Sequence, residues 1–480
     1  APPSSIGKFG GDTDNWIWPR HTGDFSMFRV YASKDNRPAA YSPQNVPYRP
    51  KKHFSISTKG VKEGDFTMIY GFPGNTQEYI LSDAVAYIAE RSDPAKIAIR
   101  TGRLDIITKA QESDPALRIH YAAKHASIAN AWKKWQGEAL GIDRRGTVAA
   151  KFDYETQFGL WSVGRPEYAG VVMGLRVEYD RIMDAYFAYE ITRETLSTLP
   201  AAYTPEERAE ECFARRKSAE QALWRHAFRE YGRCPKVYRT PSYAEGMARY
   251  KSPEAYADAL FEAVWEGSDS VAMQPAVRLR EETKRMLDHI SWMLGTKSLR
   301  NLNSKILNEL YTTYIKGLRE WDRERAFYPD ANLTLRVAYG SVAGYEYADG
   351  EYHKPQTTLD GIIAKDNPEI YDYDIPQSLR DLYASKNYGR WGTVIDGRRT
   401  VPVCFLATNH TTGGNSGSPV LNAGGELIGI NFDRTWRSTM SDIAYDPAIC
   451  RNIAVDIRYV LFVVDRVGGA GYLLKEMTLK

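Results

Sequence analysis

The hydrophobic pattern of this 480-residue chain changes from β to helical and back to β. Up to about residue 75, short apolar stretches such as Phe66–Tyr70 are separated by turn residues, which is typical of strands. From about Ser82 to Arg325, apolar residues recur every three or four positions, which indicates amphipathic helices. From Asn332 onward the strand pattern returns. We therefore expect an α+β protein in which a large helical domain is inserted into one β-structured unit.

This change of pattern divides the chain into three segments. Residues 1–80 are expected to belong to a β-barrel region, 81–330 to the inserted helical domain, and 331–480 to a C-terminal β-barrel. Three elements can be compared directly with a structure. They are a strand over Phe25–Tyr31, a strand over Leu333–Ala338, and a helix that begins at the capping-box sequence Thr204-Pro205-Glu206-Glu207 and runs to about Arg229.

Composition excludes several classes of protein. The chain is 43% hydrophobic and 26% charged, which is ordinary for a globular protein, and its net charge of +3 is too small to favour nucleic acid as a partner. No apolar run is long enough for membrane insertion. The four cysteines, Cys212, Cys234, Cys404 and Cys450, include no CxxC pair, which argues against a zinc site and leaves their disulfide state open.

A glycine-rich loop lies between two apolar runs near the C-terminus. It reads TTGGNSGSP from Thr411 to Pro419 and follows the run Val401–Ala407. A serine nucleophile needs an adjacent base and amide donors aimed at the oxyanion, and flanking glycines allow such a backbone. The loop resembles the nucleophile loop of chymotrypsin-fold proteases, with Ser416 as nucleophile and the N–H groups of Gly414 and Ser416 as oxyanion hole. The alternative is a hairpin without chemistry.

An aspartate upstream of this loop is a candidate for the aspartate of a catalytic triad. Asp24 stands where a predicted strand begins, and an aspartate at such an edge can accept a hydrogen bond from an imidazole Nδ1–H. The competing interpretation is a turn aspartate after Gly23, and spacing alone favours that interpretation.

Two long motifs make a family resemblance specific. The run GGDTDNWIWPRHTGDF from Gly10 to Phe25 and the run from Thr411 to Val420 resemble signatures of the S46 family of bacterial dipeptidyl-peptidases. The resemblance covers essentially the whole chain. It implies a chymotrypsin-like double β-barrel, incomplete here, with an inserted helical domain that caps the active site. It also implies Asp24 as the triad aspartate and Ser416 as the nucleophile, without a metal or cofactor.

The resemblance also implies how a free N-terminus is held. The matching residues are Asn15, Trp16, Asn130 and Asp433. Holding an ammonium group at a fixed distance from the serine requires a carboxylate and amide oxygens, so these residue types fit the task. Without the family, Asn130 would be interpreted as a helix-end residue and Asn15 as a turn residue.

Arg434, eighteen residues after Ser416, is expected to select the substrate. In the family, a glycine at this place accompanies apolar side chains, whereas an arginine accompanies Asp or Glu at P1, the residue before the cleaved bond. A guanidinium binds a carboxylate through two hydrogen bonds, which supports the acidic subtype. The alternative is an arginine paired with a structural carboxylate, such as Asp433.

None of the eight histidines matches the position of the family's triad base. His21 stands three residues before Asp24, and His410 stands six residues before Ser416. We interpret both as supporting residues of their motifs. The chain is therefore expected to be the C-terminal part of the enzyme, without the triad histidine, and to be inactive by itself.

The expected function is that of a serine exopeptidase that releases dipeptides from the free N-terminus of peptides and prefers Asp or Glu at P1. Two alternatives stay open: an apolar-P1 dipeptidyl-peptidase of the same family, and a catalytically dead protease-fold binding protein. The resemblance further implies a homodimer in the periplasm or at the cell surface.

Overall fold

The computed structural model describes residues 1–267, 270–295 and 303–480, and it divides into two compact units. One, here called the β unit, comprises Ala1–Glu78 and Asp330–Lys480. The other, the helical unit, is the continuous stretch Tyr79–Pro329. The sequence analysis expected these boundaries after residues 80 and 330.

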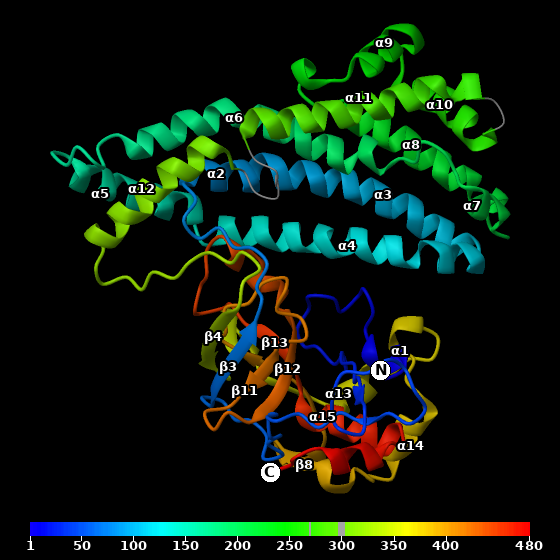
Figure 1. Ribbon diagram of the computed structural model, residues 1–480, viewed down its shortest axis with the longest axis vertical. Helices are drawn as coiled ribbons and strands as arrows, with labels where there is room; N and C mark the ends of the chain where they lie inside the picture. The colour runs from blue at the N-terminus through cyan, green and yellow to red at the C-terminus, as the bar shows by residue number, and fades with distance from the viewer. Residues whose placement is uncertain (268–269, 296–302) are drawn as a thin grey trace. The chain divides into compact units, whose positions relative to one another are not determined.

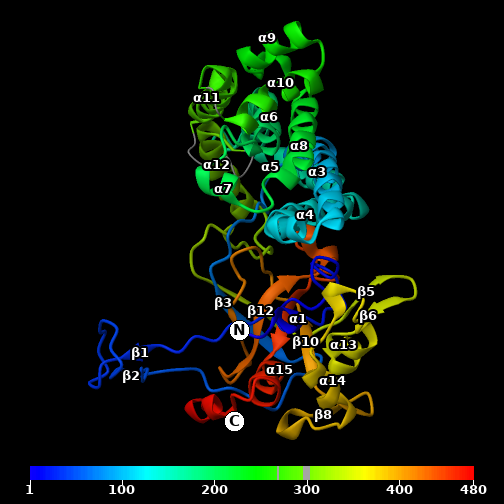
Figure 2. The same ribbon diagram turned by 90° about the vertical axis from the view of Figure 1, so that its right-hand side faces the viewer.

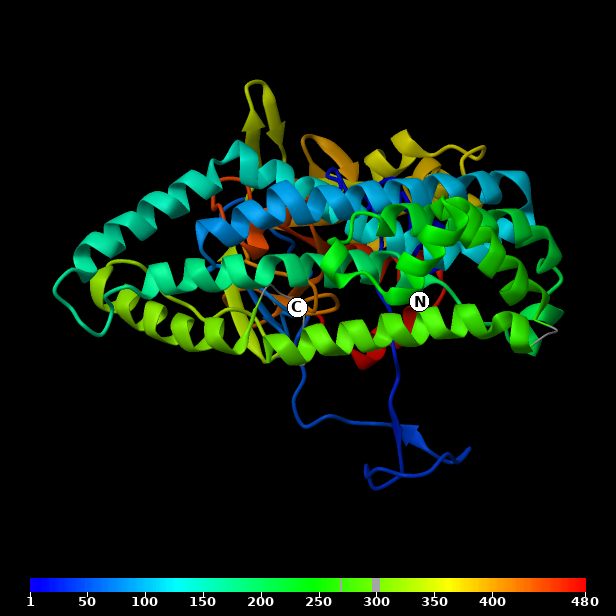
Figure 3. The ribbon, with the colours of Figure 1, turned by 90° about the horizontal axis from the view of Figure 1, so that it is seen from above.

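Long helices lie side by side in the helical unit (Figure 1 and Figure 3). No helix among the described residues is long and apolar enough to cross a lipid bilayer. The helices are α2 (Ser82–Ala86), α3 (Asp93–Ser113), α4 (Pro115–Arg144), α5 (Thr147–Ser162), α6 (Val171–Glu194), α7 (Pro205–Ala209), α8 (Lys217–Tyr231), α9 (Pro241–Tyr250), α10 (Pro253–Glu266), α11 (Ser270–Leu294) and α12 (Lys305–Trp321).

Short polar side chains cap the starts of several of these helices. Asp114, Thr240 and Ser252 each accept a hydrogen bond from a backbone N–H at the start of α4, α9 and α10, and a proline follows each of them. The capping box predicted at Thr204 is present. Its hydroxyl accepts from Glu207 N at 3.2 Å, and the Glu207 carboxylate accepts from Thr204 N at 2.7 Å.

The helix that begins at this capping box is shorter than predicted. α7 ends at Ala209 and α8 begins only at Lys217, where one helix was expected to reach about Arg229. The turn between them allows Phe213 to stack on Trp265, with ring centroids 4.2 Å apart. Burial of this aromatic pair outweighs the continuation of a charged, weakly amphipathic helix.

The crossing of α3 and α8 leaves no room for an extra side-chain atom. His226 on α8 is buried, and its Nε2 lies 2.8 Å from the carbonyl oxygen of Ile99 on α3. Gly102 lies nearly one turn further along α3, and a Cβ there would overlap the His226 ring. The crossing therefore requires glycine, although glycine inside a helix costs about 1 kcal/mol relative to alanine.

A seven-stranded sheet forms the core of the β unit (Figure 1). The strand order is β4-β3-β11-β12-β13-β10-β7, and every neighbouring pair is antiparallel. Beyond the end of β4, Val342 bridges to Ala407 on β10, so the strands from β4 to β10 in this order close into a hydrogen-bonded ring. The strands are β3 (Phe66–Gly71), β4 (Arg336–Ser341), β7 (Gln356–Thr358), β10 (Pro402–Ala407), β11 (Pro419–Leu421), β12 (Leu427–Arg434) and β13 (Asn452–Asp456).

Apolar side chains from several of these strands pack into one cluster. Strands β10 and β13 are buried at every residue, and α15 (Ile457–Phe462) packs against both. Sheet and helices together confirm the predicted α+β class. The cluster consists of Val61, Ile69, Val342, Phe405, Val420, Ile428 and Ala454.

The predicted strand Phe25–Tyr31 is wrong for most of its length. Only Tyr31–Ala32 forms a strand, β1, which pairs with β2 (Val46–Pro47) in a hairpin that extends away from the sheet (Figure 2). Phe28 is 89% exposed. The alternating pattern does not become a strand because the described residues offer residues 25–30 no neighbouring strand.

Shorter elements complete the β unit. The predicted strand Leu333–Ala338 begins only at Arg336, because Leu333 has a left-handed backbone with φ of +65°. The remaining elements are α1 (Ser4–Gly7), β5 (Tyr345–Ala348), β6 (Glu351–His353), α13 (Leu359–Lys365), α14 (Gln377–Ala384), β8 (Thr393–Ile395) and β9 (Arg398–Thr400).

Gly102→Ala is expected to lower the free energy of unfolding by about 1–3 kcal/mol, because the added methyl group overpacks the contact with His226. Gly159→Ala is the matched control. Gly159 lies inside α5, a Cβ there meets nothing within 4 Å, and the methyl group removes only backbone freedom. This variant should gain roughly 0.5–1 kcal/mol. Urea denaturation followed by circular dichroism measures both, and stabilisation by Gly102→Ala would contradict the packing argument.

Candidate active site

The loop from Thr411 to Pro419 connects β10 to β11. Gly414 has φ of +108° and Gly417 has φ of +82°, values that favour glycine. A Cβ on Gly414 would also overlap the carbonyl oxygen of Phe72, so no side chain fits there. In the described part of the chain, the N–H groups of Gly414 and Ser416 donate to no acceptor. These are the two donors that the sequence predicts as an oxyanion hole.

The turn Gly71–Asn75 packs against this loop and was not predicted as part of the site. Gly74 N donates to the carbonyl oxygen of Gly413 at 2.6 Å. A Cβ on Gly71 would overlap the Ser418 hydroxyl. The signal was available in the sequence, because two glycines directly after a strand mark a close approach of another backbone.

Ser416 is exposed, and its hydroxyl donates to the carbonyl oxygen of Phe432 at 3.3 Å. Phe432 lies at an irregularity of β12, since the register against β13 shifts between Asn431 and Asp433. Such a β-bulge inserts one residue and redirects its backbone, and bulges are common beside active sites. The bulge thus turns a strand carbonyl toward the predicted nucleophile.

No histidine among the described residues contacts the Ser416 hydroxyl, whose hydrogen bond goes to Phe432. His410 Nε2 lies 2.9 Å from the carbonyl oxygen of Ser441, and burial lowers the pKa of His410. His21 is buried too, and burial, aided by the charge of Lys365, lowers the pKa of His21 to about 3. Both rings are therefore neutral at ordinary pH.

Asp24 lies beside the charged residues of the first motif. Its carboxylate accepts no hydrogen bond within the described ranges. Although part of Asp24 is exposed, desolvation raises the pKa of its carboxyl; Arg20 opposes this shift and Asp433 adds to it. Asp24 and Asp433 therefore lie close enough to interact. The role of Asp24 as the triad aspartate stays a prediction.

A buried ion pair that was not predicted joins the first motif to β12. Arg20 NH1 lies 2.8 Å from the Asp433 carboxylate, and Trp16 N donates to the same carboxylate oxygen at 3.4 Å. The structure thus brings Trp16 and Asp433 together, with Asn15 adjacent in the chain. Arg20 is the one arginine or lysine in the motif from Gly10 to Phe25, and this was the available signal.

Arg434 is buried and paired with a structural carboxylate. Its NH1 and NH2 groups lie 2.6 and 2.8 Å from the two carboxylate oxygens of Asp442. NH1 also donates to the carbonyl oxygen of Thr411 at 3.2 Å and to the Ser441 hydroxyl at 2.9 Å. The alternative raised from the sequence named Asp433, but the carboxylate that binds the guanidinium is that of Asp442, and Asp433 accepts from the backbone N of Arg434. A substrate carboxylate would have to share this guanidinium with Asp442.

Asn130 lies on α4 of the helical unit and is exposed. Its predicted role in holding a substrate amine stays a prediction.

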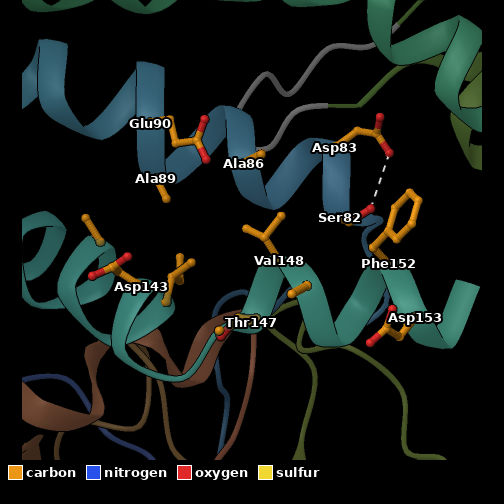
Figure 4. Close-up of a pocket in the computed structure, with 14 residues that line it drawn as sticks. Ser82, Asp83, Ala86, Ala89, Glu90, Asp143, Thr147, Val148, Phe152 and Asp153 are labelled. Atoms are coloured by element: carbon orange, nitrogen blue, oxygen red, sulfur yellow. Dashed lines mark hydrogen bonds between the residues drawn. The ribbon is translucent and has the colours of Figure 1, made fainter.

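The helical unit contains a cleft of about 710 Å³ (Figure 4). Neither histidine nor cysteine lines it, and Ser82, which does, donates its hydroxyl to Glu155 at 2.8 Å. The cleft therefore lacks the groups for acyl transfer. Its carboxylates belong to Asp83, Glu90, Asp143 and Asp153.

One cluster in the described residues has the chemistry of a metal site. Potential ligand atoms of His120, Glu210 and Cys212 lie within 4.8 Å of one another. However, Arg216 NH1 lies 2.7 Å from His120 Nε2 and 3.3 Å from the Glu210 carboxylate, so a cation already contacts these groups. The guanidinium of Arg216 thus occupies the place of a cation, bound to His120 and paired with Glu210. All four cysteines of the chain are buried free thiols.

Comparison with known proteins identifies relatives over the whole chain. The sequence matches the family described as Peptidase S46 over residues 1–204 and 188–479. Asp/Glu-specific dipeptidyl-peptidases from Capnocytophaga gingivalis and Flavobacterium psychrophilum are each 42% identical, with coverage of 100% of this chain and 72% of the relative. A dipeptidyl-peptidase 7 from Phocaeicola vulgatus is 34% identical over 100% of this chain and 71% of its own length.

A solved structure has the same fold. The crystal structure of Porphyromonas endodontalis DPP11 in complex with the dipeptide Arg-Glu matches with a TM-score of 0.84 and 34% sequence identity. The match covers 100% of this chain and 74% of that chain.

The buried, neutral His21 is expected to make the protein less stable in acid. Burial lowers the pKa of His21 from 6.5 to about 3, so between these values the unfolded chain binds a proton that the folded chain does not. This stabilisation is complete above pH 6.5 and is lost as the pH falls toward 3, by at most roughly 1.4 kcal/mol per pH unit. His21→Leu should therefore show a flatter pH dependence of the free energy of unfolding, measured by urea denaturation between pH 7 and 5. Equal slopes for both proteins would contradict this assignment.

Proposed function

This chain belongs to the peptidase S46 family, and we propose that it is a serine dipeptidyl-peptidase that cleaves after Asp or Glu at the second residue of peptides with a free N-terminus. The observation that carries the proposal is the loop of Ser416, in which the N–H groups of Gly414 and Ser416 donate to no acceptor among the described residues. The names of the 42% identical relatives, and the dipeptide Arg-Glu bound to the DPP11 neighbour, support the acidic preference.

The proposed reaction is acyl transfer. The Ser416 oxygen attacks the carbonyl carbon of the second residue, and the N–H groups of Gly414 and Ser416 stabilise the oxyanion. The serine proton passes to a histidine base, which is none of the eight described histidines. Asp24 accepts a hydrogen bond from the imidazole and stabilises the imidazolium. The shortened peptide leaves with the proton, and water hydrolyses the acyl-enzyme to release the dipeptide. Each step uses protein groups and water alone.

The proposed amine site lies next to the nucleophile along β12. Asp433 would supply a carboxylate beside Trp16 and Asn15, and the family resemblance adds Asn130 as a further residue for the amine. The ion pair with Arg20 holds the Asp433 carboxylate in one orientation, with one oxygen bound to Arg20 at 2.8 Å. A substrate ammonium would bind this preformed arrangement, and the distance from Asp433 to Ser416 would set the length of the product.

The finer architecture is part of the same proposal. The ring of strands would be one of the two barrels of a chymotrypsin-like fold. We also propose a homodimer located in the periplasm or at the cell surface, as the resemblance implies.

One observation favours a second candidate, the apolar-P1 dipeptidyl-peptidase. The guanidinium of Arg434 is already bound by Asp442 through both of its terminal nitrogens. If Asp442 keeps this guanidinium, the pocket presents no cation to an acidic side chain.

A panel of four fluorogenic dipeptidyl substrates tests the proposal on protein purified from its intact gene. The substrates end in Asp or in Leu, each with a free or an acylated N-terminus. Rapid cleavage of only the free-amine Asp substrate is expected, and Ser416→Ala should reduce turnover by about 10⁶-fold. Preference for Leu would keep the peptidase and remove the argument from Arg434. If nothing is cleaved and a phosphonate fails to label Ser416, the binding-protein alternative gains the support.

Replacing Arg434 by Gly is expected to change the preference at P1. Because this variant leaves Asp442 buried without its partner, the substitution is made together with Asp442→Asn. Loss of a hydrogen bond to a charged group, worth about 1.5–3 kcal/mol, should lower kcat/KM for the Asp substrate by roughly 10–100-fold. The Leu substrate should lose little. The single variant Asp442→Asn serves as the control, and unchanged acidic selectivity of the double variant would show that Arg434 does not face P1.

A further inference from the structure

Two buried asparagine side chains and the backbone carbonyl of a third asparagine form a hydrogen-bonded chain that ends in the nucleophile loop. Asn452 Nδ2 on β13 donates to Asn431 Oδ1 on β12 at 2.9 Å. Asn431 Nδ2 in turn donates to the carbonyl oxygen of Asn415 at 3.1 Å. Asn415, Asn431 and Asn452 are 3%, 2% and 1% exposed, so water does not compete for these bonds. We call this set the amide chain.

The last bond of the amide chain acts on the peptide unit that carries a predicted oxyanion donor. The carbonyl of Asn415 and the N–H of Ser416 belong to the same peptide bond. Because a trans peptide is planar, its C=O and N–H point in opposite directions. A hydrogen bond that fixes the Asn415 oxygen therefore also fixes the direction of the Ser416 N–H. Ser418 N donates to the same oxygen at 3.0 Å, so two donors hold it.

Asn452 determines which way the Asn431 amide faces. By donating to Asn431 Oδ1, it keeps that oxygen toward β13 and leaves the NH₂ group toward the loop. The opposite orientation would place the Asn431 oxygen against the carbonyl oxygen of Asn415, two acceptors without a proton between them. The direction of the whole chain is therefore set at its inner end.

The Asn452 side chain leaves one of its own atoms unsatisfied. Its Oδ1 is buried and accepts no hydrogen bond in the described part of the chain. An apolar residue of similar shape would remove this unsatisfied acceptor, but it would also remove the donor to the buried Asn431 Oδ1. These two effects on stability oppose each other, whereas the orientation of the Asn431 amide depends on the Asn452 donor.

We propose that Asn431 and Asn452 are positioning residues of the oxyanion hole, which hold the Asn415–Ser416 peptide so that its N–H points at the developing oxyanion. The inference rests on the proposed acyl-transfer function and adds residues that neither triad nor substrate pocket contains. The loop is also tied to β12 by backbone bonds, from Gly417 N to Asn431 O at 2.8 Å and from Asn431 N to Ser418 O at 2.9 Å. These bonds survive any change of the Asn431 side chain, so the variants are expected to fold.

The test compares Asn431→Leu and Asn452→Leu with Asn409→Leu in protein purified from its intact gene. Asn409 is a matched control because it is 2% exposed and its side chain bonds to β3 and β4, at 2.7 Å to the Thr67 hydroxyl and 3.0 Å to the carbonyl oxygen of Ala338. All three changes keep the number and branching of the side-chain heavy atoms, and all three add similar bulk. The readouts are kcat and KM for the substrate that the wild type cleaves, the rate of phosphonate labelling, and the melting temperature.

Asn431→Leu should lower kcat and the labelling rate by about 10²-fold with little change in KM, as expected for a misdirected oxyanion donor. Asn452→Leu should lower kcat in the same way with little change in the melting temperature, because removal of the unsatisfied Asn452 oxygen offsets the loss of the donor to Asn431 Oδ1. Asn409→Leu should lower the melting temperature and leave kcat unchanged. This opposition between stability and kcat separates positioning from a structural role.

Two results would overturn the inference. If Asn431→Leu and Asn452→Leu keep the kcat of the wild type, the amide chain is structural, and the proposed function is unaffected. If Asn431→Leu does not fold, the kcat of Asn452→Leu alone tests the inference. A wild-type protein that neither cleaves a substrate nor reacts with the phosphonate would instead refute the proposed function, and the positioning role with it.

Discussion

The buried ion pair between Arg20 and Asp433 connects the two parts of the sequence that carry the chemistry. Its partners are separated by 413 positions in the chain, yet Arg20 NH1 lies 2.8 Å from the Asp433 carboxylate and both side chains are largely shielded from solvent. Removing one partner of such a pair typically costs 3–5 kcal/mol, because the other charge stays buried alone. Asp24 follows Arg20 closely in the chain, and Ser416 contacts the carbonyl of Phe432, the neighbour of Asp433. The pair thereby determines where the predicted triad aspartate and the nucleophile lie within one unit.

Features that depend on local sequence could be predicted, whereas those that depend on distant partners could not. The capping box at Thr204 and the glycine-rich loop around Ser416 are encoded within a few residues, and both are present. The strand expected over Phe25–Tyr31 failed because a strand needs a neighbour that its own pattern does not reveal. The helix expected to reach Arg229 ended early for the same kind of reason, a contact made by a ring far along the chain. The site residues Asn15 and Asn130 came from the family resemblance, since their residue types alone favour turns and helix ends.

The partner of Arg434 shows how much a single charge balance matters for specificity. Asp442 lies at the end of the short 3₁₀ helix Trp436–Asp442, and no pattern in the sequence distinguishes it from a surface residue. Together Arg434 and Asp442 form a neutral buried pair. A substrate carboxylate entering this pocket would add a negative charge in a region of low dielectric, where an uncompensated charge is costly. In an acid-specific enzyme the pair would therefore have to rearrange, whereas an apolar side chain could enter without disturbing it.

The bulge at Phe432 has a consequence for how such an enzyme would determine the length of its product. In a regular strand, neighbouring side chains face opposite sides, so adjacent positions cannot serve one cavity. The register shift between Asn431 and Asp433 breaks that alternation. Consecutive residues then supply the Phe432 carbonyl near Ser416, the Asp433 carboxylate proposed for the amine and the Arg434 guanidinium proposed for the P1 side chain. The spacing between the groups that would bind a substrate is then set by the covalent backbone, about 3.8 Å per residue, and not by side-chain packing. Small changes in the core would therefore leave this spacing unchanged. Product length would change only by inserting or deleting a residue in β12, which is a discrete event.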